Sequence, residues 1–131
     1  MRRATAFLMM FVLVSCGGQN DGICETPPEA KWATTKDSCI HRAAYKYARS
    51  AATNSELAKA VRTECDEKIL EFAKGMTDLK RKVLDRKGTA YTQEDYDEGL
   101  DQAYQYVEKE AEAEALRRIV QAKAGNCDLP E

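Results

Sequence analysis

The chain has 131 residues, with 20 lysines and arginines against 22 aspartates and glutamates, so its formal net charge is −2. That length suits one domain and excludes a multi-domain enzyme. The charge balance excludes a strongly basic nucleic-acid-binding protein. From Cys16 onward, only sixteen of 116 residues are Leu, Ile, Val or Phe. So thin a supply of large apolar residues borders on the composition of disordered chains, and a folded domain needs additional support.

The N-terminus has the features of an export signal. Arg2 and Arg3 precede a nine-residue apolar stretch, Ala6 to Val14, which is too short to span a bilayer as a helix. The stretch runs into the sequence Leu13-Val14-Ser15-Cys16. This sequence resembles the lipobox of bacterial lipoproteins, with leucine at −3, a small residue at −1 and cysteine at +1. The resemblance implies cleavage before Cys16 and attachment of diacylglycerol to its sulfur.

The same resemblance implies where the protein is located. Residues 1–15 are then a signal peptide, and acyl chains on Cys16 anchor the mature protein stably in a membrane. Because the next residue is Gly17 and not aspartate, the periplasmic face of the outer membrane is the expected location. Residues 16–31 predict a flexible tether, and residues 32–131 a helical domain. The alternative is an ordinary secretory signal followed by a cysteine by chance.

Four cysteines remain if Cys16 carries lipid: Cys24, Cys39, Cys65 and Cys127. An even number in an exported chain with a thin core predicts two disulfides. A zinc site is the alternative, but the sequence has no CxxC pair and a single histidine, so the usual ligand spacing is absent. We therefore expect no metal and no cofactor.

The spacing of apolar residues predicts an all-α fold, a small disulfide-stapled bundle of about three helices. The first helix is expected from Thr35 to Ala52. The second begins near Thr53, and its apolar residues recur in steps of three or four as far as Val83, with Gly75 as a bend or close contact. The third begins at Thr92 and ends at Gly125-Asn126.

The second and third helices are predicted to form a long antiparallel hairpin. Basic residues gather between Lys80 and Lys87, and acidic residues between Glu94 and Asp101, on either side of a short loop from Gly88 to Tyr91. Each cluster has the sign that its helix terminus prefers. Polyanion binding by the basic cluster and calcium binding by the acidic cluster are the alternatives, although the acidic spacing fits a calcium loop only loosely. Pairing within one chain and pairing between two chains both remain open.

Helix geometry bears on how the cysteines pair. If the first two helices are antiparallel about a turn near residue 53, Cys39 and Cys65 lie nearly opposite each other. That pairing leaves Cys24 to bond with Cys127. The alternative joins Cys24 to Cys39 and Cys65 to Cys127. With so few large apolar residues, we expect reduction to unfold at least the first helix.

Candidate functional residues are few. His41 is the one histidine, and no recognised nucleophile or catalytic motif accompanies it. Tyr45, Tyr106 and His41 are predicted to form a partner-binding surface, since aromatic residues anchor interfaces. Three further tyrosines are expected in the helical core, with Trp32 packed on the hairpin; these tyrosines are Tyr47, Tyr96 and Tyr104.

The segment Cys-Ile-His-Arg-Ala-Ala-Tyr at residues 39–45 resembles a motif of small exported proteobacterial proteins that have no assigned activity. The resemblance implies a disulfide between the first two helices and implies no reaction. The sequence therefore favours a lipid-anchored, non-enzymatic binding or structural module that binds an envelope protein or polymer. The alternatives are a small inhibitor of an envelope-attacking hydrolase such as lysozyme, and an enzyme that uses His41.

Overall fold

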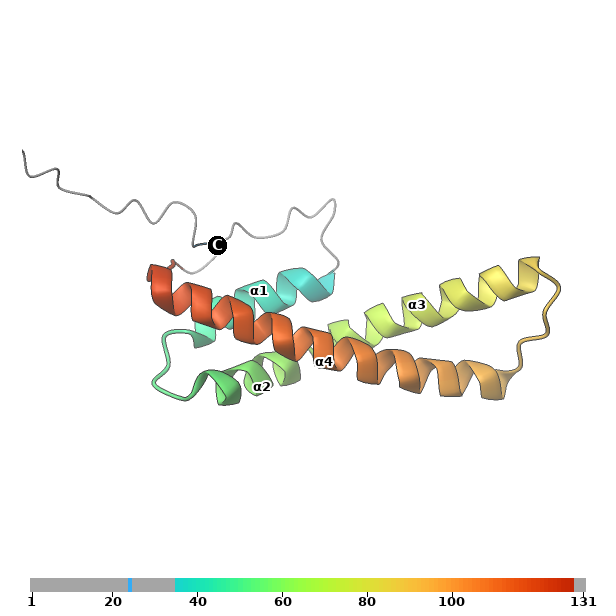
Figure 1. The fold of residues 1–131 in the computed structure, drawn as a ribbon, viewed down its shortest axis with the longest axis horizontal. Helices are drawn as coiled ribbons and strands as arrows, with labels where there is room; N and C mark the ends of the chain where they lie inside the picture. Colours follow the sequence, from blue (N-terminus) through green and yellow to red (C-terminus); the bar gives the residue numbers. More distant parts are fainter. Residues whose placement is uncertain (1–23, 25–34, 129–131) are drawn as a thin grey trace, which may run out of the picture.

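A computed structural model describes Cys24 and residues 35–128 of the chain. These residues form four helices and no strand: α1 (Thr35–Tyr47), α2 (Asn54–Glu64), α3 (Asp66–Arg86) and α4 (Gln93–Gly125). The all-helical prediction is confirmed, whereas the predicted count of about three is one too low. Figure 1 shows α4 running the length of the molecule, with α1 and α2 beside one half and α3 beside the other.

The additional helix arises from a break at Cys65, where one long helix was predicted. The backbone there has φ −98° and ψ 10°, so Cys65 ends α2 and begins α3. Hydrogen bonding continues across the break, because the Cys65 amide donates to Val61 and its carbonyl accepts from Ile69, each at 3.0 Å. The change of direction lets α2 and α3 both pack along α4. Gly75, where a bend or close contact was expected, lies in uninterrupted helix and has open space beside it.

Local signals fix most of the helix ends. Thr53 and Thr92 form capping boxes with Glu56 and Asp95, in which each side chain bonds the backbone of the other residue. Asn126 ends α4 in the left-handed conformation with φ 49°. The first helix ends at Tyr47, five residues earlier than predicted, because residues 48–53 form the turn that leads into the cap of α2.

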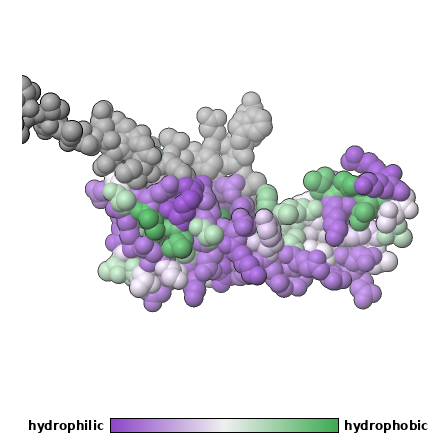
Figure 2. Space-filling view, viewed as in Figure 1, coloured by the Kyte–Doolittle hydropathy of each residue, from purple (hydrophilic) through white to green (hydrophobic). Residues whose placement is uncertain are grey.

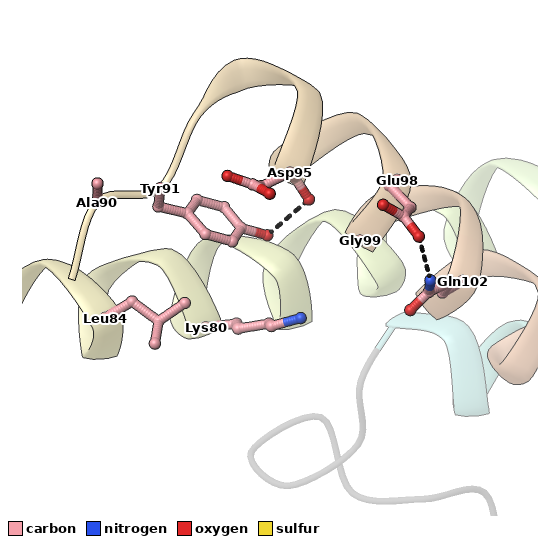
Figure 3. Close-up of a pocket in the computed structure, with 8 residues that line it drawn as sticks. All are labelled: Lys80, Leu84, Ala90, Tyr91, Asp95, Glu98, Gly99 and Gln102. Carbon is pink, nitrogen blue, oxygen red and sulfur yellow. Dashed lines mark hydrogen bonds between the residues drawn. The ribbon is translucent and has the colours of Figure 1, made fainter.

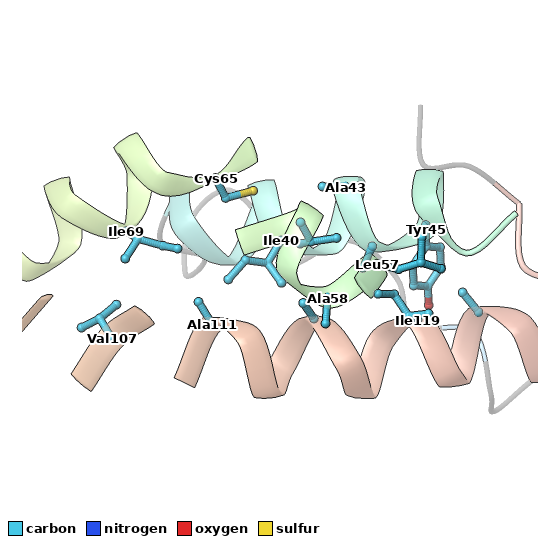
Figure 4. Close-up of a cluster of buried hydrophobic side chains, with 14 of the residues drawn as sticks. Ile40, Ala43, Tyr45, Leu57, Ala58, Cys65, Ile69, Val107, Ala111 and Ile119 are labelled. Atoms are coloured by element: carbon cyan, nitrogen blue, oxygen red, sulfur yellow. The ribbon is translucent and has the colours of Figure 1, made fainter. Parts of the chain in front are cut away.

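The core contains residues from all four helices, as Figure 4 shows. Many of these residues are alanine, whose small side chain lets helix backbones approach closely. The four helices can therefore pack into a core that contains few large apolar side chains. The fully or nearly fully buried apolar residues are Ile40, Ala43, Ala44, Tyr45, Leu57, Ala58, Val61, Cys65, Ile69, Ala73, Val107, Ala111, Ala115, Ile119 and Ala122.

Two cysteine pairs lie at bonding distance. The sulfurs of Cys39 and Cys65 are 2.09 Å apart, and those of Cys24 and Cys127 are 2.00 Å apart. These are the pairs that helix geometry favoured. The first pair joins α1 to the junction of α2 and α3, and the second joins Cys24 to Cys127, two residues after the end of α4. The predicted signal peptide, Cys16, Gly17 and Trp32 all lie outside the described residues.

Candidate functional site

The half of the α3–α4 hairpin that extends past α1 and α2 is the candidate functional site. Its turn is formed by Gly88, which has φ +69°, and by the cap of α4. The hydroxyl of Tyr91 donates to the Asp95 carbonyl at 3.1 Å and holds the turn against the first coil of α4. The hairpin end is therefore a defined structure, although no other described helix supports it (Figure 1).

Polar contacts join α3 to α4 in this half. The Tyr96 hydroxyl donates to Asp78 at 3.1 Å, and the Arg81 guanidinium lies 5.0 Å from the Tyr96 ring centroid. Nearer the core, the Tyr104 hydroxyl donates to Asp66. That hydrogen bond, together with burial, raises the pKa of Tyr104 to about 12. These tyrosines were predicted as core residues; they are half-buried, with their hydroxyls used to join the two helices.

An apolar stripe on α3 has no described neighbour to cover it. Met76 is 40% exposed, Leu79 is 60% exposed and Val83 is 39% exposed. The repeat along the second predicted helix has the spacing of a helix-packing face, and at these three residues no described helix of the same chain packs on it. The physical reason is that α1 is only 13 residues long and begins beside Phe72, so it does not extend over the residues that follow on α3. Figure 2 shows hydrophobic side chains gathered at the far end of α3 among hydrophilic ones.

A shallow hollow of about 310 Å³ lies between α3 and α4 beside the turn (Figure 3). Lys80 lines it from α3, and Asp95 and Glu98 line it from α4. Gly99 forms part of its floor, where an added Cβ would lie 2.8 Å from the Tyr91 hydroxyl. Asp95 is held by the cap, which lowers the pKa of its carboxyl through the hydrogen bonds from Thr92. The hollow is small and polar, and its acidic residues are already used in local hydrogen bonds.

The structure does not bring the three predicted surface residues together. Tyr106 is exposed on α4, but His41 is 1% exposed and Tyr45 is also buried, so the surface prediction is wrong for both. Their rings lie against each other, with centroids 4.3 Å apart and planes tilted by 32°. They are buried because α1 packs this face against α4 and not against solvent.

Arg118 on α4 is the partner that the sequence did not indicate. Its guanidinium contacts Nδ1 of His41, and because arginine can only donate, Nδ1 accepts and the histidine proton is on Nε2. Glu114 accepts from Arg118 at 2.6 Å and also from Arg117. The hydrogen bonds from Arg117 and then from Arg118 hold the pKa of Glu114 at about 2. His41 therefore lies in a buried polar network that joins α1 to α4.

Within residue 24 and residues 35–128, no group of three or more His, Cys, Asp or Glu side chains is placed to hold a metal ion. None of the four described helices is long and apolar enough to cross a membrane. Comparison of the chain with protein-family models, with curated proteins and with solved structures gives no match.

Proposed function

We propose that this protein is a lipid-anchored module of the bacterial cell envelope that binds another protein through the free end of its α3–α4 hairpin. The observation that carries the proposal is the separation of its two ends. Cys24 is joined to Cys127, two residues after α4 ends, whereas the hairpin turn precedes α4. A lipid on Cys16 therefore attaches the molecule at one end of its longest helix and leaves the hairpin at the other.

The dimensions favour a role in reaching away from the membrane. The eight residues from Cys16 to Cys24 span at most about 28 Å when fully extended. Helix α4 has 33 residues and is about 50 Å long at 1.5 Å per residue. A tether shorter than the helix keeps the attached end close to the bilayer, while α4 carries the hairpin turn outward.

The surroundings of His41 favour binding over catalysis. A general base must lie within hydrogen-bonding reach of the proton it removes. The His41 ring is buried between Tyr45 and Arg118, where a substrate does not reach it without displacing α1. The exposed apolar stripe of the hairpin is instead available to a macromolecular partner, in keeping with what such patches usually mark.

Membrane fractionation and intact-mass measurement test the anchor. We expect the membrane-extracted protein to have the mass of residues 16–131 plus acyl chains, and reduction to add two hydrogens for each disulfide. The Cys16→Ala variant should lose the acyl mass and leave the membrane fraction. The matched control, Cys24→Ala with Cys127→Ala, removes a disulfide elsewhere. This variant should keep the acyl mass and stay in the membrane fraction. An unacylated mass for the unmodified chain would refute the anchor.

A further inference from the structure

The exposed stripe on α3 continues a stripe that a helix already covers. At the covered end, Cys65 is bonded to Cys39 of α1, and Lys36 of α1 lies 4.9 Å above the Phe72 ring. From Phe72 the apolar positions step by four, three and four residues to Val83. That alternation is the spacing at which one helix packs along another. The covered half and the exposed half therefore have the same spacing, and among the described helices only α1 packs on this stripe, over the first half.

Charge is distributed unevenly around the exposed half. At 100° per residue, Lys80 and Lys87 flank the stripe on the side toward α4, and Arg86 flanks it on the other side. The same rotation places Asp78 and Asp85 on the opposite side of α3, where Asp78 accepts from Tyr96. The stripe thus has basic flanks on α3. The carboxylates of Asp95 and Glu98 on α4 lie across the hollow from Lys80, so Arg86 and Lys87 carry the basic character at the far end of the stripe.

We propose that this face of α3 binds an acidic amphipathic helix of a partner protein, aligned end to end with α1. The inference rests on the proposed binding function and names the chemistry of the partner. Apolar residues of that helix cover Met76, Leu79 and Val83, and its flanking glutamates and aspartates meet the basic flanks. The length from Met76 to Lys87 is about 18 Å, so a helix of about three turns covers it.

The probe is a synthetic, lactam-bridged helical peptide of about 14 residues, with leucine at the contact positions and glutamate on both flanks. A second peptide has lysine in place of every glutamate. Fluorescence anisotropy of each labelled peptide is measured against the full chain, in neutral phosphatidylcholine nanodiscs if it carries acyl chains and in buffer if it does not. The binding test is therefore independent of the outcome for the anchor.

The chain offers a matched pair of variants. Val83 lies in the stripe, and Val120 is an exposed valine of α4, at 47%, outside it. We expect Val83→Asp to weaken binding of the acidic peptide at least about tenfold, as for an interface anchor. Val120→Asp should leave binding unchanged. Arg86→Glu should weaken binding and reduce its dependence on salt. Leu79→Gln is a milder change in the same stripe, and circular dichroism checks that each variant is folded.

Several outcomes would overturn the proposal. One is the absence of saturable binding of the acidic peptide at millimolar concentration. Another is binding of the lysine peptide as tight as that of the acidic peptide. A third is weakening of acidic-peptide binding by Val120→Asp as strong as that by Val83→Asp. A dimer that Val83→Asp dissociates would assign the stripe to a second copy of this chain. Binding to vesicles containing phosphatidylglycerol that Val83→Asp abolishes, without peptide binding, would assign it to an anionic bilayer.

Discussion

Removal of the disulfide in the core tests how this alanine-rich fold is stabilised. Cys39 and Cys65 are 26 residues apart in sequence, and Cys24 and Cys127 are 103 residues apart. Loop-closure entropy assigns about 3.5 kcal/mol to the shorter loop and about 4.7 kcal/mol to the longer one. A domain of this size has a total stability of about 5–15 kcal/mol, so either loss is a large fraction of it.

We expect Cys39→Ala with Cys65→Ala to lower the free energy of unfolding by about 3.5 kcal/mol. The corresponding fall in Tm is about 15–25 °C. Alanine is chosen because Cys65 is fully buried, and a serine hydroxyl there would have to leave water. Helix α1 should be affected most, since 13 residues are too few to form a stable helix alone.

Urea denaturation and hydrogen exchange under non-reducing conditions measure both effects. The amides of α1 should lose protection before those of α3 and α4. The control, Cys24→Ala with Cys127→Ala, should lower stability by about 4.7 kcal/mol without selectively exposing α1. Unchanged stability of the core variant, or α1 amides that exchange no faster than those of α3, would refute the reasoning.

Three further predictions concern single contacts. The pKa of Glu114 is held at about 2, so its ionised carboxylate stabilises the fold fully above the unfolded pKa near 4.5, and this stabilisation is lost as the pH falls toward 2. Glu114→Gln should remove about 1–2 kcal/mol of this acid-dependent stability, after allowance for solvent screening. Denaturation curves recorded across this pH range measure the loss. Because Asp66 raises the pKa of Tyr104 to about 12, absorbance titration of Asp66→Asn should show one tyrosine ionising nearer pH 10, and no change in the titration would contradict the hydrogen bond. Gly99→Ala should stabilise the Tyr91→Phe variant by about 1 kcal/mol, because alanine favours the helix more than glycine does. In the unmodified chain the gain should be smaller, because the added Cβ would lie 2.8 Å from the Tyr91 hydroxyl. Equal gains in both chains, measured by thermal melts, would argue against that contact.

Local features of the fold could be predicted because the groups involved are close in sequence. Thr53 and Thr92 stand three residues before their carboxylate partners, and both capping boxes form. Asn126 follows Gly125 and ends α4 as expected. The break at Cys65 could not be predicted in this way, since neither glycine nor proline marks it. It depends on α2 and α3 each packing along α4, which is a tertiary effect.

Periodicity also could not show what covers an apolar face. The repeat from Leu57 to Val83 is regular, yet burial stops beside the N-terminal end of α1, so Leu57 is buried and Val83 is exposed. For the candidate site, sequence reasoning identified the hairpin and its charged ends but not the open stripe between them. The burial of His41 could not be predicted, because its partner, Arg118, is 77 residues away in sequence and arginine is seldom buried.

The disulfide at the end of α4 decides which parts of the molecule bear tension. If the protein is anchored and binds a partner as proposed, a pull on the anchor passes from Cys24 through the bond to Cys127 and then along α4 to the turn. Helices α1 and α2 form a side branch of this path and are not stretched. A helix loaded along its axis, with a covalent link near its C-terminal end, lets α4 carry tension directly, so the short helices α1 and α2 do not have to transmit it.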